Sequence, residues 1–250
     1  MKVIGVIPAR YHSTRLPTKL LVDILGKPMV QHVYELAQKA KLLDEIIVAT
    51  DDERIVAAVR DFGGRVVLTS PAHVSGTDRT AEVASSSDAD IVVNVQGDEP
   101  LLDPEMIDEC VRALQNALLD NDGVEFSTVI KRAGEEVFND QSVVKVVRDL
   151  KGRALYFSRS LIPFPRRKIE AFQVFEHIGL YAYTKGCLLR LSQLPPTPLE
   201  QVEGLEQLRA LENGIAIQTV ETKYQGELIS VDTLEELNQV RAILAKRVKL

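Results

Sequence analysis

The first residues that could do chemistry form a cationic loop. Arg10, Arg15 and Lys19 lie within ten residues, directly after an apolar run, and Ser13 adds a hydroxyl donor. Arginine can contact phosphate oxygens with two N–H groups, and lysine supplies a compact positive charge, so this loop suits a polyphosphate. The alternative is a solvated basic loop. The segment matches neither GxxxxGK[ST] nor GxGxxG, which disfavours a P-loop or a Rossmann dinucleotide site.

Two acidic segments could hold a metal ion. Asp98 and Glu99 follow the apolar run and glycine of VNVQGDEP, and Asp232 lies in ISVDTLEEL. Carboxylates just beyond a buried strand are well placed to hold Mg²⁺ against ligand phosphates. The alternatives are an acidic turn at Asp98 and a helix cap at Asp232, with Glu235 as its capping-box partner.

Further polar residues could contact a ligand. Ser75, Gly76 and Arg79 in SGTDR begin a predicted helix, whose N–H groups could bind an anion or a base edge, or could simply form an N-cap. Arg159 follows an aromatic strand and precedes two prolines, which fits a loop facing a substrate. His177 stands alone in EHIGLYAY and could equally be a core residue. Three polar residues have the i, i+3, i+4 spacing of one helical face and could also be a surface cluster: Glu203, Glu206 and Gln207.

The elements that position these residues alternate between strands and helices in the first half. Short apolar runs predict strands at 3–8, 45–50, 65–70 and 90–95, and helical spacing predicts helices at 29–42, 52–62, 77–87 and 104–119. This rhythm indicates an α/β fold with a mostly parallel central sheet and helices on both faces. Ligands of such sheets bind at the carboxyl ends of the strands, where the cationic loop and Asp98 are expected.

The second half is less regular. Strands are predicted at 125–132, 143–149, 154–158, 177–185 and 215–222, with a helix over 199–214 that ends at Gly214 and a last helix from Asp232. Some of these strands alternate in hydropathy, which suits a mixed or antiparallel extension of the sheet. We therefore expect a single domain over 1–250, within which residues 128–185 could form a smaller inserted portion.

Composition excludes several classes of protein. The chain has 250 residues and a formal net charge of −6, which argues against a general nucleic-acid binder. Its two cysteines form no metal-binding pattern and predict buried thiols in a reducing compartment. No segment approaches the roughly 18 apolar residues of a membrane span, and no signal-peptide pattern is visible. These observations predict a cytoplasmic protein without membrane or nucleic-acid partners.

The order of the motifs resembles that of the 3-deoxy-manno-octulosonate (Kdo) cytidylyltransferases, also called CMP-Kdo synthetases. The resemblance extends from residue 3 to about residue 242 and rests on IPARYHSTRLPTK, GKPM, ATDD, SGTDR, VQGDEP, YFSR, HIGLYAY, LEQLRALENG and VDT. The first motif alone is similar to a wider class of sugar nucleotidyltransferases, and the later ones are more specific.

The resemblance implies that CTP and Kdo react to give CMP-Kdo and diphosphate, with Mg²⁺, for the core of lipopolysaccharide. It also implies a Rossmann-like nucleotidyltransferase fold with a smaller dimerisation and lid portion, and a homodimer. A related acidic sugar stays open as the acceptor, either an 8-amino form of Kdo or one of sialic-acid type. The segment 166–174 is shorter than in many relatives and could line the entrance near the sugar. A nucleotide sensor on the same fold is the non-catalytic alternative.

The matched motifs also imply roles for individual residues. Asp98 and Asp232 would hold the metal and, with Arg10 and Lys19, carry out catalysis. CTP would be bound by Arg10, Ser13, Arg15, Lys19, Ser75, Gly76, Arg79 and Gln96. The sugar would be bound by Gln96, Arg159, His177, Tyr181, Glu206 and Gln207. The role of Glu203 stays open.

Overall fold

The computed structural model describes residues 1–11, 16–167 and 173–248. The chain divides into two compact units, and each is treated by itself. One unit comprises Met1–Asp108 together with Tyr224–Leu250, and the other comprises Glu109–Lys223. The second unit contains the whole 128–185 segment. Sequence positions Ser13 and Arg15 lie outside the described residues.

The first unit is built on four parallel strands in the order β6-β1-β4-β5. These are β1 (Val3–Ala9), β4 (Glu45–Thr50), β5 (Val66–Leu68) and β6 (Ile91–Val95). β6 is buried throughout and β1 almost throughout, as expected for strands covered on both faces. Ala9 pairs with Thr50 at the carboxyl ends of β1 and β4, so the residues that follow these strands emerge at one edge.

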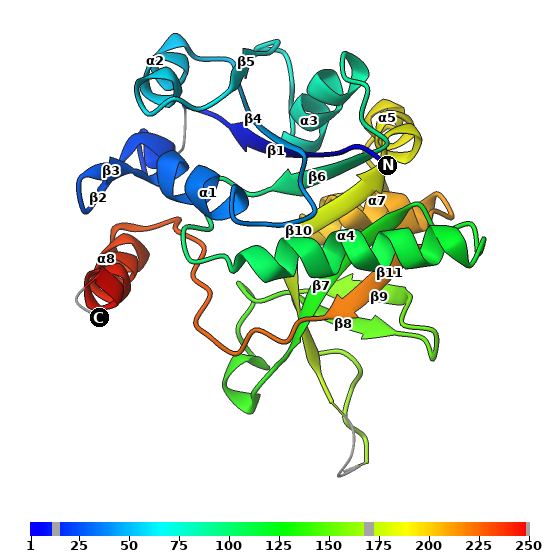
Figure 1. Cartoon of the computed structure of the whole chain (residues 1–250). Coiled ribbons are helices and arrows are strands. Elements are labelled where there is room, and N and C mark those ends of the chain that lie inside the picture. Colours follow the sequence, from blue (N-terminus) through cyan, green and yellow to red (C-terminus); the bar gives the residue numbers. More distant parts are fainter. Residues whose placement is uncertain (12–15, 168–172, 249–250) are drawn as a thin grey trace. The chain divides into compact units, whose positions relative to one another are not determined.

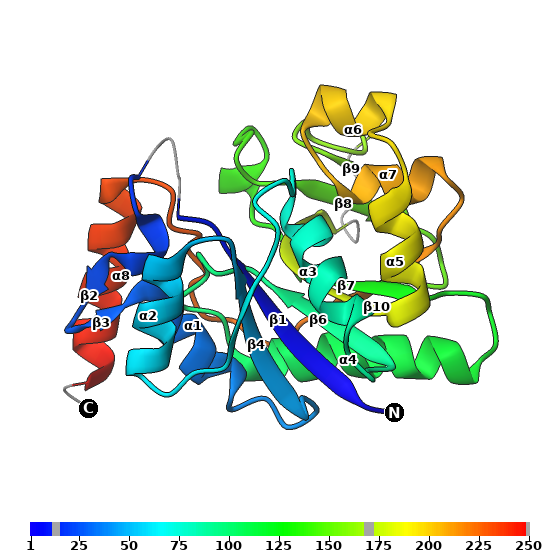
Figure 2. The same ribbon diagram turned by 90° about the horizontal axis from the view of Figure 1, so that it is seen from above.

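Helices cover this sheet on both sides. α1 (Met29–Ala37) and α2 (Glu53–Asp61) lie on one side and α3 (Gly76–Ser85) on the other (Figures 1 and 2). The short helix η1 (Lys19–Leu21) and the strand pair β2 (Asp23–Ile24) and β3 (Lys27–Pro28) follow the cationic loop. α8 (Leu234–Val248) ends the chain. α4 (Pro104–Leu119) has the predicted bounds and begins after Asp103, whose carboxylate accepts a hydrogen bond from the N–H of Glu105.

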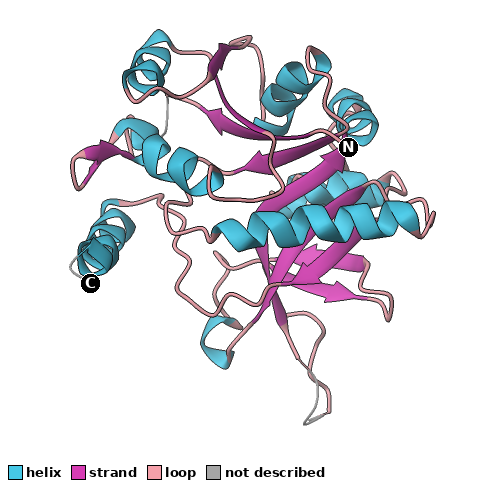
Figure 3. Ribbon diagram, in the orientation of Figure 1, coloured by secondary structure: helices cyan, strands magenta, loops and turns pink. Residues whose placement is uncertain are grey.

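The second unit has a mixed sheet (Figure 3). β7 (Phe126–Arg132) lies between β10 (Phe175–Thr184), which is antiparallel to it, and β11 (Ile217–Glu221), which is parallel. β8 (Lys145–Arg148) pairs with β10 and with β9 (Ala154–Ser158), in both cases antiparallel. The short helix η2 (Glu135–Val137) follows β7, and α5 (Lys185–Gln193) follows β10.

The helix predicted over 199–214 was wrong, because the chain forms two shorter helices there. α6 (Pro198–Glu203) ends at Gly204, whose φ of 64° is left-handed, and α7 (Gln207–Glu212) starts a new helix. Glycine adopts this conformation without the steric penalty of a side chain, so Gly204 ends the first helix.

The cysteines and the hydropathy of the helices can be compared with the predictions made from composition. Cys110 and Cys187 are free and buried, as their apolar surroundings predicted. Among the described residues, no helix has both the length and the apolar composition needed to cross a bilayer.

Candidate active site

Lys19 brings the two predicted metal-binding carboxylates together in the first unit. Its ammonium nitrogen lies 2.6 Å from Asp98 Oδ2 and 2.8 Å from Asp232 Oδ1. The three side chains are between 12% and 28% exposed, so the cluster is shielded but open to solvent. The sequence separations are 79 and 213 residues, so only the folded chain creates this cluster.

The backbone explains why these residues meet. Asp98 follows β6, and its carbonyl accepts a hydrogen bond of 2.9 Å from the N–H of Val231. This bond holds the segment before α8 beside the end of β6, so Asp232 lies next to Asp98. A Cβ on Gly97 would come within 3.2 Å of Leu20, so glycine permits close packing of the turn against η1.

The N-terminus of α8 is capped by Thr233, one residue later than the cap considered from the sequence. The Thr233 hydroxyl accepts from the N–H of Glu236, and the Glu236 carboxylate accepts from the N–H groups of Asp232 and Thr233 at 2.7 Å. This is a capping box between Thr233 and Glu236, so the assignment of Asp232 as cap with Glu235 as partner was wrong. Because Thr233 performs the capping, the carboxylate of Asp232 can face Lys19.

The electrostatics of the cluster favour one cation between two anions. Burial alone lowers the pKa of Lys19, but the charges and hydrogen bonds of Asp98 and Asp232 outweigh it, so its pKa is raised. Burial, reinforced by the charge of Asp98, raises the pKa of the neighbouring Glu99 to about 8. Glu99 is therefore mostly protonated at neutral pH, and the negative charge of this turn belongs to Asp98.

The cluster suits a metal that is shared with a phosphate ligand. Across the described ranges, no three His, Cys, Asp or Glu side chains converge to enclose a metal by themselves. The ammonium of Lys19 shows that a cation fits between Asp98 and Asp232. Mg²⁺ typically takes one or two carboxylates and completes its shell with phosphate oxygens and water, so a two-carboxylate site fits that ion.

Other predicted CTP residues border the same sheet edge. Arg10 follows β1, and its guanidinium donates to the carbonyl of His73 at 3.3 Å. Ser75 is the N-cap of α3 in a capping box with Asp78, which confirms the cap considered for SGTDR. A Cβ on Gly76 would come within 3.3 Å of Pro8, so glycine lets α3 begin close to β1. Gln96 follows β6 and donates to the side chain of Asn94.

Arg79 is fully buried, which restricts what it can contact. Its guanidinium donates to Asp51 Oδ2 at 2.9 Å and to the hydroxyl of Thr69, while its Nε has no hydrogen-bond partner within the described chain. Asp51 lies in the motif ATDD, but nothing in that motif indicated a role for it. The available signal was its position directly after β4, at the edge where the other polar residues emerge.

Removing the charge of Asp51 should destabilise the first unit. Asp51→Asn leaves the buried guanidinium of Arg79 without its anionic partner, which should lower the free energy of unfolding by about 3 kcal/mol. Urea unfolding measures the loss. Asp61→Asn at the exposed end of α2 is the matched control and should change stability by less than about 0.5 kcal/mol. Equal stability of the two variants would show that the Asp51–Arg79 pair contributes little.

The predicted sugar-binding residues, Gln96 apart, belong to the second unit. Arg159 follows β9, and its guanidinium donates from Nε to the carbonyl of Glu203 and from Nη1 to that of Gln141, both at 2.9 Å. Gln207 is 5% exposed, and its Nε2 donor has no partner in the part of the chain that the structure describes. A buried, unpartnered amide donor is costly unless a ligand or water accepts from it, which favours a binding role.

His177 and Tyr181 are placed side by side by an irregularity in β10. The pairing with β7 shifts between Ile178 and Tyr181, and the two rings have centroids 5.4 Å apart. The Thr128 hydroxyl donates to the carbonyl of Leu180, so its oxygen accepts from Nε2–H of His177 at 2.9 Å. Strand bulges commonly re-aim side chains near functional sites. The Tyr181 hydroxyl contacts Gln207 Oε1 at 3.5 Å, and the neighbouring Glu206 is exposed.

Acidification should destabilise the protein through His177. Burial lowers its pKa to about 3, against 6.5 in the unfolded chain, so between these values the unfolded state binds the extra proton. Lowering the pH from 7 to 5 should therefore reduce the free energy of unfolding by about 2 kcal/mol through this residue. His177→Gln, which keeps a donor for Thr128, should flatten the pH dependence by that amount in urea unfolding. An unchanged pH dependence would contradict the assignment.

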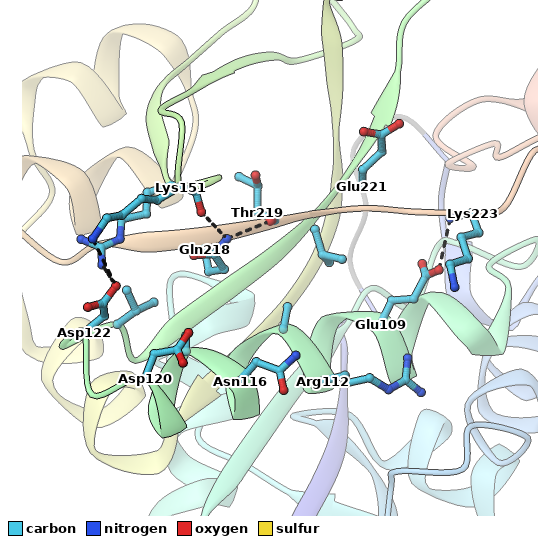
Figure 4. Close-up of a pocket in the computed structure, with 15 residues that line it drawn as sticks. Glu109, Arg112, Asn116, Asp120, Asp122, Lys151, Gln218, Thr219, Glu221 and Lys223 are labelled. Carbon is cyan, nitrogen blue, oxygen red and sulfur yellow. Dashed lines mark hydrogen bonds and ion pairs between the residues drawn. The ribbon is translucent and has the colours of Figure 1, made fainter.

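The second unit has a groove of about 600 Å³, and none of the predicted site residues lines it (Figure 4). α4 and β11 supply most of its lining, and its charged side chains are partly paired with each other. Asp122 bonds to Arg153 and lies 3.7 Å from Lys151, and Glu109 Oε1 accepts from the N–H of Lys223. Glu109 Oε2 has no hydrogen-bond partner in the described residues, and Arg112 also lines the groove. The groove therefore gives no clear indication of a ligand.

Comparison with known proteins identifies close relatives. Residues 4–221 match the family model described as cytidylyltransferase. The 3-deoxy-manno-octulosonate cytidylyltransferase of Geobacter metallireducens is 52% identical, covering 96% of this chain and 96% of that protein. The protein of the same name from Geotalea daltonii is 53% identical, covering 99% of this chain and all of that protein.

Solved structures give the same picture. The structure of a CMP:2-keto-3-deoxy-manno-octonic acid synthetase complexed with CTP aligns with a TM-score of 0.90 and 44% identity, covering 99% of this chain and 100% of that chain. A cytidylyltransferase from Leptospira borgpetersenii aligns with a TM-score of 0.65 at 18% identity, which shows a shared fold alone.

Proposed function

Since the chain belongs to the cytidylyltransferase family, among the 3-deoxy-manno-octulosonate cytidylyltransferases, we propose that it joins CTP and Kdo to give CMP-Kdo and diphosphate. The observation that carries this proposal is the cluster of Lys19, Asp98 and Asp232, because its charges suit a triphosphate and its metal. The relative of known structure at 44% identity binds CTP, which supports the choice of nucleotide.

The reaction is an in-line displacement at phosphorus. The anomeric hydroxyl oxygen of Kdo forms a bond to the α-phosphorus of CTP, the bond from that phosphorus to the β-phosphate bridging oxygen breaks, and the hydroxyl proton is released. Negative charge grows on the phosphoryl oxygens, so catalysis depends mainly on positioning and electrostatic stabilisation. We assign the binding of the triphosphate to Arg10 and Lys19, together with Ser13 and Arg15 of the same loop.

We propose Mg²⁺ as the cofactor, held by Asp98 and Asp232 together with the phosphates. When bound, it supplies charge neutralisation at the triphosphate and lowers the pKa of a coordinated hydroxyl group. Asp98 and Asp232 would hold the ion, and Lys19 would add a positive charge beside the phosphates. Ser75, Gly76 and Gln96 are assigned to the nucleotide. Arg79 is buried and bonds to Asp51 and Thr69, so its role is to stabilise the carboxyl-end edge of the sheet.

Acceptor binding is assigned to residues of the second unit. Arg159 is the natural partner for the carboxylate of Kdo, because a guanidinium can donate two parallel hydrogen bonds to a carboxylate. Neutral His177, Tyr181, Glu206 and Gln207 provide donors and acceptors suited to sugar hydroxyls. The unpartnered Nε2 of Gln207 is the strongest single support for this assignment.

The family to which the chain belongs suggests the biological setting. We propose that CMP-Kdo made here is the activated sugar for lipopolysaccharide, and that the enzyme acts as a homodimer in the cytoplasm. The free, buried thiols of Cys110 and Cys187 suit a reducing compartment.

The proposal is tested by measuring diphosphate release with Mg²⁺. We expect release that requires both CTP and Kdo and that stops when EDTA removes the metal. Separate reactions with 8-amino-Kdo and with a nine-carbon sialic acid test the two other acceptors, and Kdo should give the highest kcat/KM. If the protein bound CTP but released diphosphate with none of these sugars, it would instead be a nucleotide sensor.

A further inference from the structure

We propose that Glu203 is a positioning residue that holds Arg159 ready for the carboxylate of the acceptor sugar. The inference rests on the proposed function, because it takes Arg159 as the residue that binds that carboxylate. It gives Glu203, the last residue of α6, a role that the sequence motifs left open.

The carboxylate of Glu203 binds the end of β9. One oxygen accepts a hydrogen bond of 2.6 Å from the Ser158 hydroxyl and a longer one of 3.5 Å from Tyr156, and the other accepts from the backbone N–H of Arg159 at 3.0 Å. Ser158 is 3% exposed, so the bond between its hydroxyl and the charged oxygen is shielded from water. Charge-assisted bonds of this kind are stronger than neutral ones.

The backbone of Glu203 binds the side chain of the same arginine. Its carbonyl accepts from Nε of Arg159 at 2.9 Å, and the carbonyl of Gln141 accepts from Nη1 at the same distance. α6 ends here because Gly204 is left-handed, so the last carbonyls of this helix need external donors, and a cation is favoured at this end. Glu203 therefore contacts both the backbone and the guanidinium of Arg159.

The backbone carbonyl of Arg159 is held by Lys145. The buried ammonium of Lys145 donates to the carbonyl of Arg159 at 2.7 Å, and also to the carbonyls of Asp140 and Val143. Within the described residues, the guanidinium of Arg159 donates the N–H of Nε and one N–H of Nη1. A guanidinium has five N–H groups, so it is held in place while one N–H of Nη1 and both of Nη2 can still donate to a ligand. A group ordered before binding loses less entropy when the ligand arrives.

A direct role of Glu203 in binding the sugar is less consistent with these contacts. Both carboxylate oxygens are already used by donors of β9 and Arg159. A carboxylate placed beside the negatively charged acceptor would also repel it. The contacts therefore favour action through Arg159.

The kinetic test compares Glu203→Gln with the wild type. Glutamine has the size of glutamate but no charge. Its NH₂ group would face either the Ser158 hydroxyl or the backbone N–H of Arg159, which both donate to Glu203 in the wild type. We expect KM for Kdo to rise about 10-fold, while KM for CTP changes less than about twofold. Glu135→Gln, at an exposed position in the same unit, is the charge-matched control and should change neither constant.

A double-mutant cycle separates positioning from direct binding. If Glu203 acts through Arg159, adding Glu203→Gln to Arg159→Ala should raise KM for Kdo no further. Multiplicative effects, or equal rises in KM for CTP and for Kdo, would overturn the proposal. Ser158→Ala removes only one bond to Glu203, so it should give a smaller effect in the same direction even if Glu203→Gln folds poorly.

A second measurement does not depend on the identity of the sugar. The ¹⁵N–¹H signal of Arg159 Nε, assigned by its loss in Arg159→Ala, should exchange slowly with water in the wild type and at least about 10-fold faster in Glu203→Gln. An unchanged exchange rate would overturn the positioning role even if Kdo is the substrate. Faster exchange in a protein that does not use Kdo would support the positioning role while contradicting the proposed function.

Discussion

Asp98→Asn is expected to lower kcat for CMP-Kdo formation at least about 100-fold, the scale of losing one strong electrostatic contact in the transition state. Asp98 carries the negative charge of its turn, because the pKa of Glu99 is raised to about 8 and that residue is mostly neutral. Asparagine keeps the shape of the side chain but removes half of the anionic pair that faces Lys19.

The measurement is steady-state diphosphate release at saturating CTP, Kdo and Mg²⁺. Asp103→Asn is the matched control, because the same substitution is made five residues away at a helix cap, where asparagine is also favourable. The control should retain near-normal kcat. Near-normal kcat in Asp98→Asn would remove Asp98 from the metal site.

Asp232→Asn should also lower kcat about 100-fold, with little change in stability. The capping box of α8 belongs to Thr233 and Glu236, so Asp232 is not needed to start the helix. Its carboxylate accepts instead from Lys19 at 2.8 Å. Removing this charge should weaken metal binding, so the Mg²⁺ concentration that gives half-maximal activity should increase.

Thr233→Ala is the informative neighbour of this variant. It removes the cap and should lower the free energy of unfolding by about 1 kcal/mol, while kcat stays within a few-fold of the wild type. Activity is measured by diphosphate release and stability by urea unfolding. If Asp232→Asn lost stability and kept its activity, Asp232 would have only a structural role.

The strand and helix pattern of the first half could be predicted because local hydropathy dominates there. The four parallel strands are mostly apolar, and α4 begins at Pro104, directly after the N-cap residue Asp103. Two errors arose where two local signals competed. Gly204 interrupts a sequence with helical spacing, and the motif Thr-x-x-Glu at Thr233 begins one residue after an equally plausible Asp-x-x-Glu.

The candidate site residues could also be named from the sequence. Three cations on one loop predicted a phosphate site, and acids after apolar runs predicted a metal site, and both stay predictions. Residues whose role is to support others gave weaker signals. Asp51 and Glu203 look like ordinary acids in the sequence, and their partners, Arg79 and Arg159, are known only from the fold.

The sequence by itself determined which groups are available, namely the cations, carboxylates and polar residues and the strands that carry them. Tertiary structure decided which of them act together. Lys19 and Asp232 are 213 residues apart, and they meet because a backbone hydrogen bond holds Val231 beside Asp98 at the end of β6. Electrostatic interactions depend on distance and shielding from water, and neither is a property of local sequence. A pattern can therefore name candidate ligands of a site, while packing sets the distances between them and their electrostatic environment.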